Sequence, residues 1–271
     1  VETAIETAKS RFPATLFAAP PAAPGRGGDL IFVTGMPRTG STLVDQILSR
    51  HSQARSAGEC MALPKLYEAI VRRGLQTGED VGALIERHAD EWEVFYRKGL
   101  KLAAGSESFI IDKTLHNFWH YGLIARLFPS AKVLEIRRDP MDIGWSIFRL
   151  NLFAAHSYSN DLEDIAHALA CFEEMSAYWR SVLPRPARAI VYEELIGDFE
   201  NGVADLLGFC GLPMEEACLE FHRSSRPVFT MSAAQVRQGL STDRLGRWRT
   251  YEAHLSPLRR ALDAYSKSPQ T

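Results

Sequence analysis

Two glycines, an arginine and two hydroxyl side chains occupy one short segment and could together hold a phosphate group. Arg38 lies between Gly35 and Gly40, and Ser41 and Thr42 follow directly. A glycine-rich turn that opens a helix aims several backbone N–H groups and the positive end of the helix dipole at one point. The residue types and their spacing therefore predict an anion site.

The expected secondary structure around this turn supports the same prediction. Residues 30–33 are all apolar and predict a buried strand, and apolar residues at helical spacing predict a helix from about Ser41. The turn resembles the Walker A pattern, G-x-x-x-x-G-K-[ST], except that Ser41 stands in place of the lysine. That lysine contacts the β- and γ-phosphates of a nucleoside triphosphate, so its absence disfavours a triphosphate. We expect a less highly charged phosphate group to be bound by Arg38, Thr39, Gly40, Ser41 and Thr42.

Composition and charge limit the classes of function. The chain has 271 residues, of which 46% are hydrophobic and 24% charged, and its net charge of −2 does not suggest a general nucleic-acid or membrane-surface binder. The four cysteines form no C-x-x-C pair, which favours core thiols in a reduced compartment over a zinc site or a disulfide framework. No signal peptide or membrane-spanning apolar run is visible. We therefore expect a cytoplasmic location, with an upstream anchor left open.

Alternating strands and helices predict the fold class. Besides residues 30–33, strands are expected at residues 109–112, 131–136 and 189–192, and the amphipathic stretch 81–104 is expected to be one long helix. Strands that alternate with helices at this spacing indicate βαβ units on a parallel sheet. Ligands of such α/β sheets bind at the carboxyl ends of the strands, so the loops after the four strands should meet at one site.

The first 28 residues differ in character from the rest. Residues 1–12 can form a short helix, and residues 13–28 are rich in proline, alanine and glycine, which is typical of a linker or an extended surface segment. We therefore divide the chain into an N-terminal helix with its linker, residues 1–28, and a main domain, residues 29–271. The chain begins with valine rather than methionine, which leaves open whether it is a fragment of a longer protein and whether a helical-repeat domain precedes it.

Three separated motifs resemble the sulfotransferase family. They are Thr-Gly-Met-Pro-Arg-Thr-Gly-Ser-Thr-Leu at residues 34–43, Lys-Val-Leu-Glu-Ile-Arg-Arg-Asp-Pro at residues 132–140, and the late Gly-Arg-Trp at residues 246–248. They occur in order over roughly residues 29–250 and are most similar to the tyrosylprotein and tetratricopeptide-linked branch. The resemblance implies a P-loop-like, three-layer α/β/α fold with a central parallel sheet. It also implies 3′-phosphoadenosine 5′-phosphosulfate (PAPS) as the sulfuryl donor, with no metal.

This sulfuryl donor needs a second anion site, because it carries a 3′-phosphate apart from its phosphosulfate arm. Arg138, with the hydroxyl of Ser146 on the following helix, can supply that site, since arginine is always charged and can fork onto a phosphate. The resemblance implies that Arg247 closes over the 3′-phosphate and that Tyr192 borders the nucleotide. A further arginine of the family has no match in register here, because Arg149 comes one residue early.

The resemblance also implies roles in catalysis. Glu59 corresponds to the base of the tyrosylprotein branch, and Lys113 to the lysine that supports the leaving phosphate. Arg38 is expected to reach the sulfuryl or bridging oxygens, and Ser232 to donate a hydrogen bond to the transition state. His116 is an alternative base, because some sulfotransferases use a histidine.

Each of these assignments has a purely structural alternative. Arg138 could form a surface ion pair with Asp139 or Asp142. Lys113 could be an ordinary surface lysine, and Glu59 a solvated carboxylate or the cap of the helix that follows it. The aromatic residues Phe118, Trp119, Tyr121 and Trp145 are expected in the core rather than in an acceptor platform.

The acceptor is not defined by the sequence. Residues 223–249 are polar and lack apolar periodicity, which indicates a functional loop or lid. We predict a PAPS-dependent sulfotransferase that transfers a sulfuryl group in line to a hydroxyl or amine, on a protein tyrosine, a carbohydrate or a small molecule. A P-loop phosphotransferase that uses a nucleoside triphosphate is a less favoured alternative, because Ser41 replaces the lysine and no Walker B acid follows a strand. A nucleotide-binding module without catalysis is the third alternative.

Overall fold

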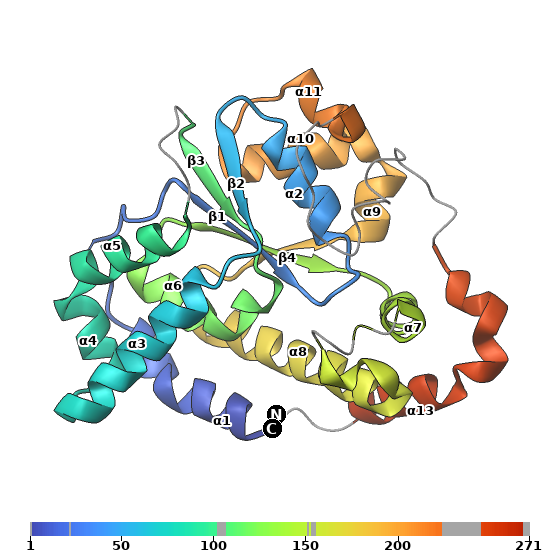
Figure 1. Cartoon of the computed structure of the whole chain (residues 1–271), viewed down its shortest axis with the longest axis horizontal. Coiled ribbons are helices and arrows are strands. Elements are labelled where there is room, and N and C mark those ends of the chain that lie inside the picture. Colours follow the sequence, from blue (N-terminus) through green and yellow to red (C-terminus); the bar gives the residue numbers. More distant parts are fainter. Residues whose placement is uncertain are drawn as a thin grey trace.

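Residues 30–35 form the central strand of the protein. The computed structural model describes residues 2–21, 23–101, 107–150, 152, 156–223 and 245–267. Within these ranges five parallel strands form one sheet in the order β2-β3-β1-β4-β5 (Figure 1). The strands are β1 (Leu30–Gly35), β2 (Ala54–Gly58), β3 (Phe109–Asp112), β4 (Lys132–Arg137) and β5 (Arg188–Val191). The α/β fold with a parallel sheet is confirmed, and the loop after β1 lies between the exits of β3 and β4.

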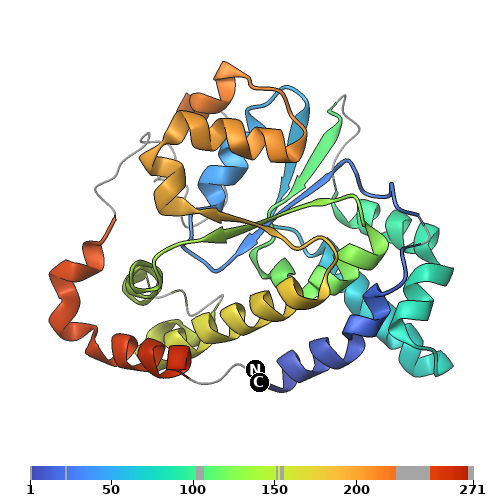
Figure 2. The same cartoon turned by 180° about the vertical axis from the view of Figure 1, so that it is seen from behind.

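Helices cover both faces of the sheet. The helices on one face are α2 (Ser41–Ser49), α9 (Tyr192–Gly197), α10 (Phe199–Cys210) and α11 (Glu216–Leu219) (Figure 1). Those on the other face are α1 (Glu2–Arg11), α3 (Ala62–Thr77), α4 (Val81–Arg87), α5 (Ala89–Gly99), α6 (Tyr121–Leu127) and α8 (Leu162–Val182) (Figure 2). Leu30 and Phe32 of β1 pack into one hydrophobic cluster, and Ile31 and Val33 into the other. Burial on both faces explains why residues 30–33 of this strand are all apolar.

The remaining elements lie near the carboxyl end of the sheet or connect helices. They are the helices α7 (Pro140–Leu150) and α13 (Ser256–Lys267) and the 3₁₀ segments η1 (Ala14–Phe17), η2 (Leu115–His120), η3 (Ser157–Asn160), η4 (Phe221–Arg223) and η5 (Arg247–His254). α7 follows β4 directly, and it contacts η5 and α13. Among the described residues, we find no helix with the length and apolar character needed to cross a membrane.

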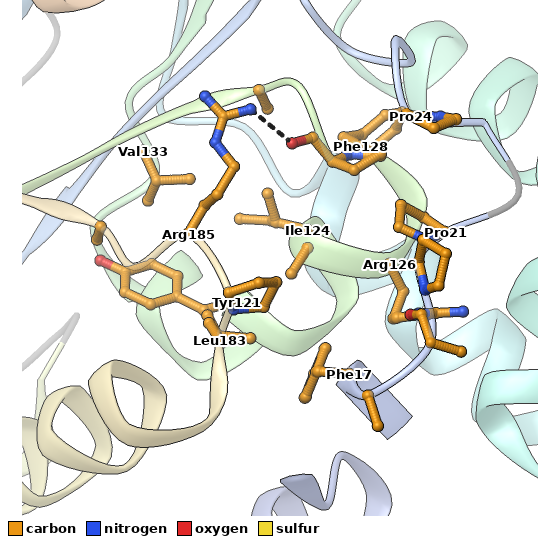
Figure 3. Close-up of a pocket in the computed structure, with 18 residues that line it drawn as sticks. Phe17, Pro21, Pro24, Tyr121, Ile124, Arg126, Phe128, Val133, Leu183 and Arg185 are labelled. Carbon is orange, nitrogen blue, oxygen red and sulfur yellow. Dashed lines mark hydrogen bonds between the residues drawn. The ribbon is translucent and has the colours of Figure 1, made fainter. Parts of the chain in front are cut away.

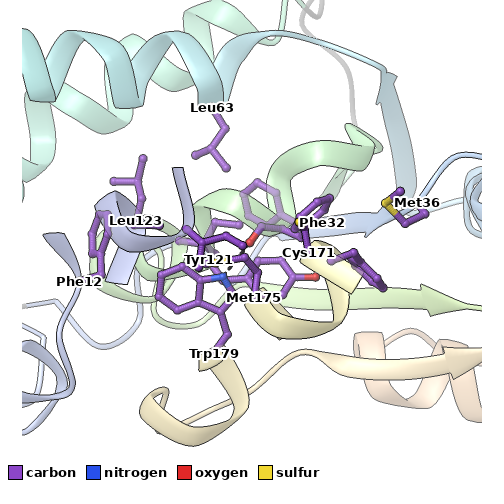
Figure 4. Close-up of a cluster of buried hydrophobic side chains, with 14 of the residues drawn as sticks. Phe12, Phe32, Met36, Leu63, Tyr121, Leu123, Cys171, Met175 and Trp179 are labelled. Carbon is purple, nitrogen blue, oxygen red and sulfur yellow. Dashed lines mark hydrogen bonds between the residues drawn. The ribbon is translucent and has the colours of Figure 1, made fainter. Parts of the chain in front are cut away.

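The core on the α8 face includes the N-terminal helix. Phe12 follows α1 and packs edge-on against Trp179 of α8, with ring centroids 6.2 Å apart, and the Trp179 indole donates a hydrogen bond to the carbonyl of Phe118 at 2.8 Å (Figure 4). Ile5 and Ala8 of α1 are buried in the same cluster. α1 is therefore packed on the sheet-bearing part of the chain. The division of the chain at residue 28 stays a prediction.

Two expectations about local structure were wrong. Residues 81–104 do not form one helix: α4 ends before His88, whose φ of −117° and ψ of 25° leave the helical region, and α5 begins after it. The side chain of Asp80 caps α4, and the Trp92 indole of α5 donates a hydrogen bond back to the carbonyl of Leu84 at 3.1 Å. Strand β2 was not expected, because Ala-Arg-Ser-Ala-Gly lacks the branched and aromatic residues that favour strands.

Candidate active site

The loop after β1 has the backbone form expected for an anion site. Gly40 caps α2 with a φ of 103°, and a Cβ atom at this position would collide with the ring of Tyr192. The Thr39 hydroxyl donates a hydrogen bond to the carbonyl of Met36 at 2.8 Å and closes the turn. Ser41 and Thr42 begin α2 and are buried. The loop therefore places the start of α2 at the carboxyl end of the sheet. A phosphate bound there can accept hydrogen bonds from the backbone N–H groups of the helix.

A cavity of about 390 Å³ lies beside this loop and contains four arginines. Its lining consists of Arg38, Arg138, Asp142, Trp145, Ser146, Arg149, Arg247, Thr250 and Tyr251. The Arg38 Nε donates a hydrogen bond to the Ser146 Oγ at 2.9 Å, which joins the loop to α7. Four guanidinium groups around one cavity create a strongly positive field that suits a phosphate.

Helix α7 supplies one wall of this arginine cavity. Trp145 and Ser146 come three and four residues after Asp142, and Arg149 comes four and three residues after them, so the four side chains lie toward one face of the helix. Sequence reasoning chose Ser146 but left the role of Arg149 in doubt and did not include Asp142 in the site. The helical spacing from Ser146 was the signal that could have identified both. Trp145, expected in the core, stacks on Tyr251 of η5 with ring centroids 4.2 Å apart.

Arg138 is held inside the site rather than at the surface. Its side chain is 10% exposed, and its Nη1 donates a hydrogen bond to the carbonyl of Arg38 at 3.2 Å. The guanidinium lies over the Tyr192 ring, 4.8 Å from the centroid. Its Nη2 is 3.5 Å from the Asp142 carboxylate. The ion pair with Asp142 therefore exists, but it is buried beside the cavity and does not lie at the surface. Arg38, Arg138, Ser146, Tyr192 and Arg247 are therefore brought together.

Glu59 and Lys113 form a second polar group at the carboxyl ends of β2 and β3. The Lys113 Nζ donates a hydrogen bond to the Glu59 Oε1, and the Lys113 backbone N–H bonds the carbonyl of Gly58 at 3.0 Å. Lys113 is 1% exposed, so it is not a surface lysine, whereas the side chain of Glu59 is 49% exposed. The pairing arises because the two strands are adjacent and parallel. One carboxylate thus reaches solvent while its ammonium partner stays buried.

Three histidines near this pair are kept neutral. Burial, with a smaller contribution from His156, lowers the pKa of His116 to about 4, against the opposing effect of Glu59. Burial also lowers the pKa of His120 to about 4 and the pKa of His156. The rings of His116 and His156 are 5.2 Å apart. A pKa this low makes His116 a weaker proton acceptor than an ordinary imidazole at neutral pH.

Two further observations complete the site. Ser232 lies outside the described residues, as does most of the segment 223–249 that was expected to act as a lid. Within the described part of the chain, no cluster of histidine, cysteine, aspartate and glutamate side chains has an arrangement that could hold a metal ion.

The fold and the site define a sulfotransferase-type α/β protein, and comparison with known sequences agrees. A family model described as Sulfotransferase family matches residues 29–216. Because this match spans more than half of the chain, the chain belongs to the sulfotransferase family. The resemblance to the sulfotransferase family is thereby confirmed; the match covers the first two motifs, and residues 246–248 lie outside it.

Individual relatives share moderate identity with the chain. A protein of Aquifex aeolicus, described as uncharacterized, is 34% identical over 238 residues, which cover 84% of this chain and 31% of that protein. A putative protein-tyrosine sulfotransferase of Caenorhabditis briggsae is 24% identical over 230 residues, which cover 81% of this chain and 80% of that protein. The chain thus spans about a third of the length of the Aquifex relative. Tyrosylprotein-type relatives are present, as the resemblance implied.

Solved structures share the fold. The sulfotransferase domain from the olefin synthase of Synechococcus PCC 7002 superposes with a TM-score of 0.57 at 18% identity, covering 90% of this chain and 96% of that domain. The sulfotransferase domain from the curacin biosynthetic pathway gives a TM-score of 0.55 at 16% identity, covering 89% and 98%. These likenesses confirm the P-loop-like, three-layer α/β/α fold.

Proposed function

We propose that this chain transfers a sulfuryl group from PAPS to a hydroxyl or amine acceptor. The arginine cavity beside the loop after β1 carries the proposal. PAPS has two separate anionic parts, a 5′-phosphosulfate and a 3′-phosphate. The loop after β1, with Arg38, suits the first part, and the cavity formed by Arg138, Arg149 and Arg247 suits the second.

The position of each cation fits its proposed role. Arg38 bonds Ser146 and lies at the border between the loop and the cavity, so it can contact the phosphosulfate while Arg138 contacts the 3′-phosphate. Tyr192 packs against both Gly40 and Arg138 and therefore borders the space between the two anion sites. A triphosphate would instead need its negative charge neutralised within the loop, where Ser41 replaces the usual lysine.

Lys113 has unused hydrogen-bonding capacity that suits a leaving phosphate. An ammonium group has three N–H donors. Among the described residues, the buried Lys113 Nζ has one acceptor, the Glu59 carboxylate. A buried cation with donors to spare gains strongly from a second anionic partner. We therefore assign Lys113 to the oxygen of the 5′-phosphate from which the sulfuryl group departs.

The reaction can be written with Glu59 as the base. The acceptor oxygen or nitrogen attacks the sulfur atom, its proton passes to the Glu59 carboxylate, and the bond between sulfur and the bridging oxygen of the 5′-phosphate breaks. The products are the sulfated acceptor and 3′-phosphoadenosine 5′-phosphate (PAP). Glu59 is favoured over His116 because its side chain is half exposed and pairs with Lys113, the cation that we assign to the departing phosphate. Ser232 stays a proposed hydrogen-bond donor to the transition state.

The experiment is a measurement of PAP release from PAPS in the presence of a tyrosine peptide, an oligosaccharide or a simple phenol. The tyrosine peptide comes first, because relatives are named protein-tyrosine sulfotransferases. PAP release that depends on one acceptor would support the proposal. PAP binding without turnover on any acceptor class would instead favour a nucleotide-binding module, and transfer from magnesium-bound ATP would favour the phosphotransferase.

Replacing the proposed base gives the largest effect that we expect in this protein. Glu59→Gln should lower turnover by about 10²–10⁴-fold, because the acceptor proton then has no carboxylate to accept it. The affinity for PAP should fall far less than turnover, since the amide oxygen of glutamine can still accept the hydrogen bond from Lys113. Glu68→Gln, on an exposed position of α3, is the matched control and should leave both quantities unchanged. Equal losses in turnover and PAP affinity would contradict the role as base.

A further inference from the structure

Asp142 is a buried carboxylate that contacts two elements lining the arginine cavity. Its side chain is 3% exposed, and its Oδ2 lies 3.5 Å from the Arg138 Nη2. The same Oδ2 accepts a hydrogen bond from the backbone N–H of Gly246 at 2.8 Å. Gly246 directly precedes Arg247, which lines the cavity from the opposite element, η5. One oxygen atom therefore joins the strand-end arginine to the backbone that carries the second arginine.

The backbone on either side of this contact is well defined. Asp142 lies in the first turn of α7, and its own N–H donates to the Asp139 Oδ1 at 2.8 Å, which fixes the start of the helix. Gly246 has a φ of 65° and caps η5, a conformation that favours glycine. η5 is further held to α7 by the stack of Tyr251 on Trp145. The Asp142 Oδ2 thus connects two ordered elements.

The charge of Asp142 is unfavourable for the function of the cavity. A carboxylate beside a phosphate site repels the ligand, because like charges at short range raise the energy of the bound state. Its presence in an otherwise basic cavity is therefore better explained by the geometry that it imposes than by its charge. An aspartate at this place weakens the electrostatic attraction for the phosphate, but it fixes the Arg138 guanidinium relative to the backbone of Gly246, which precedes Arg247.

We propose that Asp142 is a positioning residue for recognition of the 3′-phosphate. Its Oδ2 sets the separation of Arg138 and the Arg247 backbone so that both guanidinium groups meet the same phosphate. This inference rests on the proposed function, because it assumes that the cavity binds the 3′-phosphate of PAPS and PAP. It concerns a residue that does not contact the reacting atoms.

The test compares two nucleotides that differ in the 3′-phosphate alone. Calorimetric Kd values are measured for PAP and for adenosine 5′-phosphate (AMP), and their ratio, Kd(AMP)/Kd(PAP), reports recognition of the 3′-phosphate. Asp142→Ala should lower this ratio about tenfold by weakening PAP and not AMP, because the charged contact that aligns the arginines is lost. Asp142→Asn should keep the ratio within about threefold, since its amide oxygen can replace Oδ2 in both contacts.

A matched control removes another acid beside the same arginine. The Glu193 Oε1 lies 4.0 Å from the Arg138 Nε and accepts a hydrogen bond from the Asp139 backbone, on the side of α9. If Asp142 acts by positioning Arg138 rather than through its negative charge, Glu193→Gln should leave the ratio Kd(AMP)/Kd(PAP) unchanged. If Asp142→Ala does not fold, as judged by thermal unfolding, Asp142→Glu takes its place, because one added methylene displaces the carboxylate and should lower the ratio in the same way.

The alternative outcomes separate this proposal from the proposed function. A tighter or unchanged PAP complex in Asp142→Ala would overturn the positioning role, since removal of a positioning residue must weaken PAP binding. An equal loss of PAP and AMP affinity would also overturn it, by indicating a general structural effect. If the unaltered protein does not prefer PAP over AMP, the proposed function itself fails, whatever the Asp142 variants do.

Discussion

Two cavities of similar volume lie at opposite ends of the sheet, and their linings are very different. The arginine cavity, about 390 Å³, lies beyond the carboxyl ends of β1 and β4. The other, about 440 Å³, lies before β4 and β5 and is lined mostly by apolar residues of the Pro-rich segment, α6 and the loops that precede these strands (Figure 3). Of these two cavities the apolar one is slightly larger. The convergence of charged groups makes the arginine cavity the candidate site.

The two cavities also differ in how their arginines are used. In the apolar cavity, Arg185 donates a hydrogen bond to the carbonyl of Pro129 at 3.4 Å (Figure 3). Arg126 donates a hydrogen bond to the carbonyl of Ala19 and pairs with Glu86. These arginines connect segments of the chain around the cavity. In the arginine cavity, Arg38, Arg138, Arg149 and Arg247 instead line one common space. We infer that the apolar cavity contributes to packing and the arginine cavity to ligand binding.

The largest effect in this comparison should come from the apolar cavity. Phe128 is buried and packs on Tyr96, with ring centroids 5.0 Å apart. Phe128→Ala should lower the free energy of unfolding by ~3–5 kcal/mol, because a large core side chain is removed. Urea unfolding measures this change, and PAP affinity at low temperature should stay unaltered. A large loss of PAP affinity in folded Phe128→Ala protein would mean that the two cavities are not functionally separate.

A substitution in the arginine cavity should instead weaken the binding of PAP. Arg138→Ala should weaken PAP binding about 100-fold, because a charged, forked contact with a phosphate is lost from a buried position. Calorimetry measures the affinity. Arg185→Ala, at the apolar cavity, is the matched control and should leave PAP affinity unchanged. Similar PAP affinities for Arg138→Ala and the unaltered protein would contradict the assignment of the arginine cavity as the PAP site.

Arg149 tests how far the arginine cavity extends along α7. It is exposed at the surface but lines the cavity, so Arg149→Ala should weaken PAP about tenfold and AMP very little. Arg72→Ala, on an exposed position of α3, is the control for the loss of a positive charge. An unchanged ratio of AMP to PAP affinity in Arg149→Ala would place this residue outside the 3′-phosphate site.

The smallest effect that we predict concerns pH. Burial lowers the pKa of His116 to about 4, whereas an unfolded histidine has a pKa near 6.5. Between these values the unfolded chain binds more protons than the folded one, so stability is retained above pH 6.5 and falls as the pH is lowered toward 4. His116→Gln should reduce the loss between pH 6.5 and 5.5 by about 1 kcal/mol. Urea unfolding at the two pH values checks this, and an equal loss in both proteins would contradict the burial of a neutral His116.

Much of the candidate anion site could be predicted from the sequence, because short motifs encode it. Gly35, Gly40 and Arg38 belong to one continuous loop, and Arg138 and Ser146 follow one strand. Local sequence sets the turn and the helix start, and the parallel sheet brings the two segments together. Arg149 and Asp142 were not predicted as site residues, because their place beside Ser146 follows from helical spacing along α7 and not from the register of the motif.

The Glu59 and Lys113 pair shows what the sequence could not supply. Both residues were named, but the burial of Lys113 and its pairing with Glu59 depend on β2 lying next to β3. Strand β2 was not expected, so this contact could not be derived. The break between α4 and α5 was also not predicted. The apolar spacing of residues 81–104 continues across His88, whereas the backbone leaves the helical conformation at that residue.

The most direct test of the central claim is a calorimetric titration of the chain with PAP and, separately, with ATP and magnesium. The account predicts tight binding of PAP, weak or no binding of ATP, and loss of the PAP signal in Arg138→Ala. A preference for magnesium-bound ATP would contradict it, because the loop with Ser41 in place of lysine would then bind a triphosphate after all.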